Sequence, residues 1–241
     1  MHVLWEPDGT GRGTVVLLHG AMATAATWWR IGPALAGQGW RVYAIDLPGH
    51  GDTPRLDGPF SLQRFATLTA ERLPERVDLL AGHSLGAVVA LLLAAGRLRR
   101  VRALVLEDPP DRMPDAWEVP PADRDAALRR VRRLHPRWAD EDVANAVDGA
   151  SAADLAGIGA AVASRPRWNL GRLVTDAAVP IAVLTPPAGT GGALSASRTR
   201  LRQLVGANRF IEIDGGHCAH RACPDLWLAS VTRFADAVLD E

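Results

Sequence analysis

Five consecutive residues carry the strongest chemical signal in the chain: Gly82-His83-Ser84-Leu85-Gly86, which fits the pattern Gly-x-Ser-x-Gly. An apolar run at residues 77–81 precedes the motif and a helical pattern at residues 84–95 follows it. The serine is therefore predicted at a tight turn between a strand and a helix, in a strained backbone conformation with its hydroxyl exposed. The N–H of Leu85 begins the helix and can face developing negative charge. The motif predicts a serine nucleophile.

The elements that would position this serine are short apolar runs alternating with longer stretches of helical spacing. Continuous apolar runs suit strands buried on both faces, and their alternation with helices indicates a parallel sheet with helices on both faces. The predicted strands cover residues 14–18, 42–45, 77–81, 103–106, 181–185 and 210–213. The predicted helices cover residues 28–36, 61–73, 84–95, 195–205 and 226–239.

One long segment interrupts this alternation. Residues 111–177 contain no convincing strand, only Pro-punctuated pieces with helical spacing. We expect these residues to form a helical cap over one end of the strands. The remaining residues, 1–110 and 178–241, would form the α/β core.

A cluster of arginines lies inside the predicted cap. Residues 129–134 read RRVRRL, but Leu128, Val131 and Leu134 are three residues apart and form an apolar stripe. We interpret the arginines as the solvated face of a helix and expect no nucleic-acid partner.

Four segments in a fixed order resemble the α/β-hydrolase superfamily: LLHGAM at residues 17–22, DLPGHGDT at residues 46–53, GHSLG at residues 82–86 and DGGHCAH at residues 214–220. The resemblance covers nearly the whole chain. It implies a mostly parallel sheet, here of six or seven strands, because the chain before the first predicted strand is shorter than the family's opening hairpin requires.

The resemblance also implies roles for individual residues. The amide of Ala21 would join that of Leu85 in an oxyanion hole. His217 would be the base that activates Ser84, since the Gly-Gly-His context favours it over His220.

The third member of the triad departs from the usual pattern. Most relatives carry the acid in the loop after the seventh strand, but no Asp or Glu occurs between Asp176 and Glu212. Glu107 and Asp108 end the preceding strand instead. Zearalenone lactonases and haloalkane dehalogenases resemble this arrangement in taking their acid from the sixth strand. Glu107 is preferred, Asp108 is the alternative, and a Ser-His dyad or a degenerate site follows if neither serves.

These roles describe acyl transfer through a tetrahedral intermediate. We expect a serine hydrolase that cleaves an ester, lactone or thioester of a hydrophobic small molecule. An acyltransferase or cyclase of a biosynthetic pathway and a non-catalytic binding protein of the same fold stay open as alternatives. The substrate pocket is predicted to include Met22, Trp28, Trp117, Trp138 and Trp168.

The composition excludes other chemistries. All 27 cationic residues are arginine, they balance 27 acidic residues, and lysine is absent. This rules out Schiff-base, pyridoxal-phosphate and P-loop lysine mechanisms, and the lysine-assisted lyases of the resembled family. The zero net charge argues against unselective binding of polyanions.

The remaining expectations concern cofactors and location. The sequence has no dinucleotide fingerprint or metal-ligand cluster, so neither cofactor nor metal is predicted, and Cys218 and Cys223 are interpreted as free thiols. The longest apolar run, residues 87–95, is about half the roughly 20 residues of a membrane span, and the N-terminus has no signal pattern. We expect a cytoplasmic monomer or homodimer without a membrane partner.

Overall fold

The computed structural model of the 241-residue chain describes residues 2–9, 11–56, 61–97, 100–113, 121–164 and 166–239. Seven strands form one sheet in the order β1-β3-β2-β4-β5-β6-β7. Their bounds are β1 (His2–Trp5), β2 (Gly13–Leu18), β3 (Trp40–Ile45), β4 (Arg76–His83), β5 (Arg100–Glu107), β6 (Ile181–Thr185) and β7 (Phe210–Glu212). Strands β2 to β7 pair in parallel with their neighbours, and β1 pairs antiparallel with β3.

The predicted mostly parallel sheet of six or seven strands is confirmed, and each of the six predicted strands is present. The strand that the apolar runs did not indicate is β1, a four-residue strand at the edge of the sheet. It pairs on one side only, so it carries little of the continuous apolar pattern that marks a buried strand.

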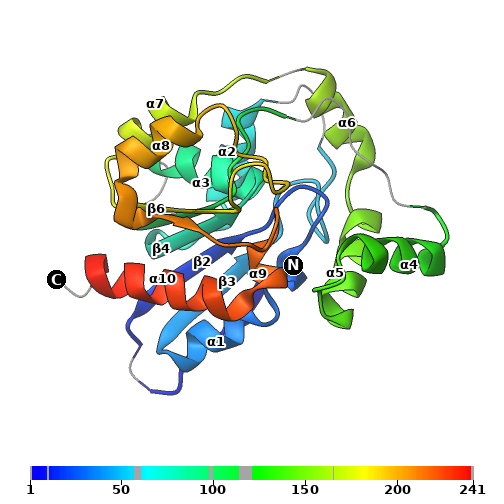
Figure 1. Cartoon of the computed structure of the whole chain (residues 1–241), viewed down its shortest axis with the longest axis horizontal. Coiled ribbons are helices and arrows are strands. Elements are labelled where there is room, and N and C mark those ends of the chain that lie inside the picture. Colours follow the sequence, from blue (N-terminus) through cyan, green and yellow to red (C-terminus); the bar gives the residue numbers. More distant parts are fainter. Residues whose placement is uncertain are drawn as a thin grey trace.

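Helices cover both faces of the sheet, as Figure 1 shows. One face packs against α2 (Leu62–Ala70), α3 (Leu85–Ala95), α7 (Leu170–Ala177) and α8 (Arg198–Val205). The other face packs against the 3-10 helix η1 (Ala25–Trp28), α1 (Ile31–Gly37) and α10 (Pro224–Leu239). A 3-10 turn, η2 (Ala207–Arg209), precedes β7, and the short helix α9 (Ala219–Ala222) precedes α10. Each face has its own apolar core, which fixes the positions of the strand ends.

The central strands set the register of the site. Strands β4 and β5 are neighbours, and His83 of β4 pairs with Glu107 of β5. Ser84 and Asp108 are the next residues along each strand, so they emerge side by side where the two strands end. This rung of the sheet, His83 beside Glu107, is called the end rung below.

The segment predicted to be a cap contains α4 (Arg124–Leu134), α5 (Asp140–Ser151) and α6 (Leu155–Ala163), all at the right of Figure 1, where α4 lies beside α5 and α6 lies above them. Helix α7 also falls in the segment assigned to the cap, yet it lies beside α8 and packs against α3 in the core. Helix α7 is therefore part of the α/β core, although the segment predicted to be a cap extends to residue 177.

Among the residues that the structure describes, no helix combines the length and apolarity needed to cross a membrane.

Candidate functional site

Ser84 occupies a strained turn at the end of β4. Its backbone has φ 51° and ψ −116°, a conformation that residues other than glycine rarely adopt. Both flanking glycines are required by close packing. A Cβ on Gly82 would overlap the carbonyl of Gly86, and a Cβ on Gly86 would overlap the carbonyl oxygens of Leu18 and His19. The turn therefore matches the strand-to-helix elbow that the motif predicted.

The loop after β2 lies against this turn. A Cβ on Gly20 would lie 2.7 Å from His83 Nδ1 and 3.2 Å from the Cβ of Ser84. Ala21, the next residue, is half-buried. The amide of Leu85 lies at the first residue of α3. The two predicted oxyanion donors thus belong to segments that flank Ser84.

Two buried histidines hold this loop. His19 donates from Nδ1 to the carbonyl of Gly20 (2.7 Å) and accepts at Nε2 from the amide of Leu47 (2.9 Å). His50 accepts at Nε2 from the amide of Met22 (3.1 Å). Burial lowers the pKa of both imidazoles, that of His19 to about 3, so both are neutral and structural.

The side chain of His217 contacts Asp108. The distance from His217 Nδ1 to Asp108 Oδ2 is 2.5 Å, and 36% of the His217 side chain is exposed while that of Asp108 is buried. Because an ionised carboxylate only accepts, Nδ1 carries the proton and Nε2 is left to act as a base. This is the geometry of an orienting acid and a general base.

The loop after β6, residues 186–197, contains no Asp or Glu and binds Asp108 instead. The amides of Ala193 and Leu194 donate to Asp108 at 2.6 and 3.2 Å, and Thr185 donates its hydroxyl at 2.9 Å. Burial opposes ionisation of this carboxyl, but the hydrogen bonds from His217, Ala193 and Thr185 outweigh it and lower the pKa of Asp108. Asp108 is therefore a fixed anion.

The sequence favoured Glu107 as the triad acid. Its carboxylate binds other residues than His217. Its carboxylate accepts from the amide and the Nδ1 of His220 (3.0 and 2.9 Å) and from the indole N–H of Trp227 (3.0 Å). The choice of Glu107 is therefore corrected to Asp108, the alternative. Glu107 is the last residue of β5, whereas Asp108 follows it with a φ of 42°, outside the extended conformation, so the two side chains take different directions.

His220 is unsuited to act as the base because both ring nitrogens are already engaged. Nδ1 binds Glu107, Nε2 lies 2.8 Å from the hydroxyl of Thr27, and only 2% of the residue is exposed. The preference for His217 over His220 agrees with this geometry.

Three buried side chains lie at the spacing of a metal site. The ligand atoms of His83, Glu107 and His220 are within 4.8 Å of one another. Hydrogen bonds account for this proximity, because His220 donates to Glu107 and His83 Nε2 donates to the carbonyl of His217 at 2.9 Å. A metal ion would have to displace these protons, so we interpret the group as part of the hydrogen-bonded core.

The predicted pocket residues have different fates. Trp28 is fully buried against His220 and Trp227, with ring centroids 4.4 and 5.7 Å away, so its assignment to the pocket is wrong. Met22, Trp138 and Trp168 are half-buried, and the structure leaves them as candidates. Trp117 lies outside the described residues.

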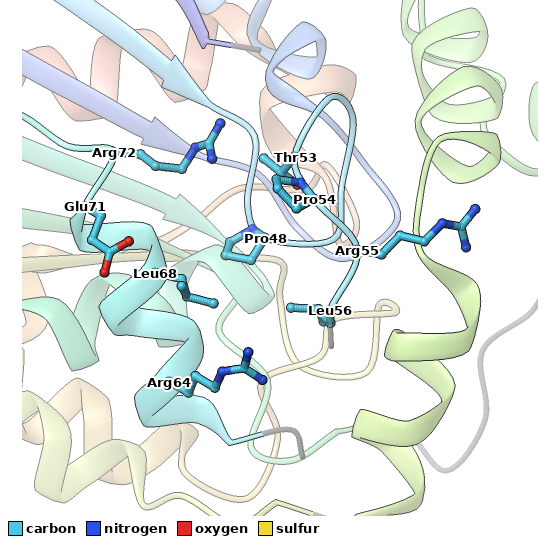
Figure 2. Close-up of a pocket in the computed structure, with 9 residues that line it drawn as sticks. All are labelled: Pro48, Thr53, Pro54, Arg55, Leu56, Arg64, Leu68, Glu71 and Arg72. Atoms are coloured by element: carbon cyan, nitrogen blue, oxygen red, sulfur yellow. The ribbon is translucent and has the colours of Figure 1, made fainter. Parts of the chain in front are cut away.

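A separate cavity of about 240 Å³ lies between α2 and the loop that follows β3. Figure 2 shows Pro48, Leu56 and Leu68 pointing toward one another, while Arg55 extends toward α6. The ion pair between Arg55 and Asp154, 3.5 Å long, explains that direction. Neither Ser84 nor His217 lines this cavity.

Known proteins share the sequence pattern. The model of the alpha/beta hydrolase family matches residues 15–231. A pimeloyl-[acyl-carrier protein] methyl ester esterase of Edwardsiella ictaluri is 37% identical over 103 residues, 43% of this chain and 39% of that protein. The protein of that name from Aeromonas hydrophila is 42% identical over 106 residues, 44% of this chain and 41% of that protein. The aligned part thus spans about two fifths of these relatives.

Solved structures share the whole architecture. The enol-lactonase from Burkholderia xenovorans aligns with a TM-score of 0.74 at 20% identity, covering 97% of this chain and 95% of that one. The thioesterase domain from the curacin biosynthetic pathway aligns with a TM-score of 0.73 at 19% identity, covering 96% and 94%. At such identities the likeness shows a common fold.

Proposed function

Because this chain belongs to the alpha/beta hydrolase family, we propose that it is a serine hydrolase that cleaves a carboxylic ester or lactone of a hydrophobic small molecule. The observation that carries the proposal is the contact of His217 with Asp108 beside the strained turn of Ser84. A nucleophile, a base and an orienting acid are the groups that acyl transfer requires.

The reaction would begin with attack of Ser84 Oγ on the substrate carbonyl carbon. The hydroxyl proton passes to Nε2 of His217, and Asp108 stabilises the resulting imidazolium through Nδ1. The carbonyl oxygen gains negative charge, which the amides of Leu85 and Ala21 would stabilise.

Collapse of this tetrahedral intermediate breaks the bond between carbon and the leaving oxygen. The alcohol leaves with the proton from His217, and the acyl group remains on Ser84 as an ester. Water then loses a proton to His217 and attacks that ester. The second intermediate collapses to release the acid and to return the proton to Ser84.

Two considerations support an ester or lactone with an apolar acyl group. Met22 follows the proposed oxyanion donor Ala21 directly and is partly exposed, and we infer that its apolar side chain borders the reacting carbonyl. Relatives are named as methyl ester esterases, and an enol-lactonase shares the fold. We further propose that α4, α5 and α6 act as the cap, and that the protein works in the cytoplasm as a monomer or homodimer.

A panel of p-nitrophenyl esters and aliphatic lactones of increasing chain length tests the proposal. We expect turnover that rises with chain length and disappears in Ser84→Ala, while Ser151→Ala, which removes a serine hydroxyl of α5 that bonds the Val147 carbonyl, keeps full activity. Absence of turnover across the panel would contradict hydrolysis. Products formed in favour of an added alcohol or amine over water would identify an acyltransferase instead.

A further inference from the structure

We propose that Glu107 and His220 form a buried clamp that positions the loop carrying His217, and that Arg221 extends this clamp to the cap. Glu107 is then a positioning residue of the reaction, distinct from the orienting acid Asp108. The kinetic part of this inference rests on the proposed function, whereas its structural part does not.

The carboxylate of Glu107 lies at the centre of the clamp. It is 1% exposed and accepts hydrogen bonds at both oxygens, from His220 and from Trp227. Burial raises the pKa of this carboxyl, so the donors are needed to hold it as an anion. A buried charge with defined partners fixes those partners in place.

The hydrogen bonds through His220 all run in one direction, from Arg221 toward Glu107. The Nδ1 of His220 donates to Glu107, and burial lowers the pKa of the imidazole well below its usual value, so Nε2 carries no proton. Nε2 therefore accepts from the hydroxyl of Thr27 at 2.8 Å, and that hydroxyl accepts from Nε of Arg221 at 2.8 Å. The chain from Arg221 to Glu107 has one consistent set of donors and acceptors.

Backbone hydrogen bonds connect this series of side chains to His217. The backbone amide of His220 donates to Glu107 at 3.0 Å, and the backbone carbonyl of His217 accepts from His83 at 2.9 Å. Both anchors, His83 and Glu107, belong to the end rung of the sheet. The segment from His217 to His220 is thus held at both ends by the rung whose next residues are Ser84 and Asp108.

Arg221 connects the clamp to the proposed cap. Arg221 donates from Nη1 to the carbonyl of Asp142 in α5 (3.2 Å), and its guanidinium lies 4.6 Å from the ring of Trp138. Arg30 donates both to the Asp142 carboxylate (2.7 Å) and to the carbonyl of Arg221 (2.8 Å). The residue after His220 therefore joins the loop to the cap helix.

The test compares Glu107→Gln with Val231→Ala. Val231 is fully buried in the same apolar core, so its truncation lowers stability without touching the clamp. Both variants are measured well below their melting temperatures, by hydrogen exchange of residues 214–223 and by kcat and KM on a p-nitrophenyl ester. We expect Glu107→Gln to lose protection of this segment, with kcat lower by about 10- to 100-fold and KM within about twofold. Val231→Ala should keep wild-type protection and kcat.

A rescue separates hydrogen bonding from charge. In Glu107→Gln the new amide N–H faces the indole N–H of Trp227, so two donors meet. Adding Trp227→Phe removes that conflict, and the double variant should recover kcat to within about threefold of wild type. Thr27→Val leaves His220 Nε2 and Arg221 Nε unpaired, and it tests the clamp if Glu107→Gln does not fold. We expect kcat to fall by about threefold or more and the amides of residues 214–223 to exchange faster.

The outcomes are distinct. Unchanged exchange in Glu107→Gln, or in Thr27→Val where Glu107→Gln does not fold, overturns the clamp. A loss of kcat in Glu107→Gln as large as that in Asp108→Asn, without rescue, also overturns it and makes Glu107 the triad acid. If the wild-type protein shows no esterase or lactonase turnover, the proposed function is contradicted but the clamp is not. Hydrogen exchange of residues 214–223 then tests the clamp without kinetic data.

Discussion

Asp108 and His217 are 109 positions apart in the chain, and their side chains are joined by a hydrogen bond of 2.5 Å. The loop after β6, which contains no carboxylate, supplies two amides to the same Asp108. The proposed orienting acid thus follows β5 directly, and the loop after β6 supports it through backbone amides.

The first prediction separates Glu107, which ends β5, from Asp108, which follows it. Asp108→Asn should lower kcat by roughly 10³- to 10⁴-fold with little change in KM, because the imidazole of His217 loses the partner that fixes its tautomer. Glu107→Gln is the matched neighbour and should lose far less. Steady-state kinetics on one activated ester checks both, and a reversed order of the two effects would refute the assignment of Asp108.

The second prediction concerns the strain at Ser84. Ser84→Gly should abolish turnover and raise the free energy of unfolding by about 1 kcal/mol, since glycine adopts a φ of 51° without steric cost. Ser151→Gly, at the end of α5, should be neutral or destabilising. Urea denaturation measures both variants, and a Ser84→Gly protein less stable than wild type would mean that the turn is unstrained.

The third prediction concerns the pH dependence of stability. Burial lowers the pKa of His19 to about 3, so between that value and its unfolded value near 6.5 the unfolded state binds more protons than the folded state. Stability is therefore lost as pH falls below about 6.5, with about 1.4 kcal/mol per pH unit coming from this histidine. His19→Asn should reduce the slope of unfolding free energy against pH by that amount. Identical slopes for wild type and variant would show that His19 titrates normally.

The fourth prediction concerns the contact between cap and core. The Asp142 carboxylate of α5 is buried and accepts from Trp29 (2.9 Å) and Arg30 (2.7 Å). Asp142→Asn should lower the free energy of unfolding by about 2–4 kcal/mol, because the half-buried guanidinium of Arg30 loses its buried anionic partner. Asp148→Asn breaks the exposed pair with Arg124 and should cost less than about 1 kcal/mol. Equal effects in denaturation experiments would contradict this account of cap docking.

Much of the site could be predicted from sequence because its parts are local. The turn of Ser84 needs a strand, two glycines and a helix within a few residues, and each of these leaves a pattern in the sequence. The strands of the sheet are recognisable for the same reason, since burial on both faces demands unbroken apolar runs.

The choice between Glu107 and Asp108 is not local. The two acids are adjacent at the end of β5, and which of them meets His217 depends on contacts with distant segments. These are the loop from residue 186 to residue 197 and Trp227 of α10, which lies 120 positions from Glu107. Trp28 was misassigned for a related reason: it follows the predicted oxyanion loop, but η1 turns it into the core beside α10. Contacts between distant elements decide both cases.

The central claim is that His217 and Asp108 activate Ser84 for acyl transfer, and covalent labelling tests it most directly. Folded wild-type protein is incubated with a fluorophosphonate, digested and analysed by mass spectrometry. The account predicts one adduct per chain, on Ser84, formed far more slowly in Asp108→Asn and His217→Ala. Folded wild-type protein without an adduct on Ser84, or labelled equally fast in all three forms, would contradict it.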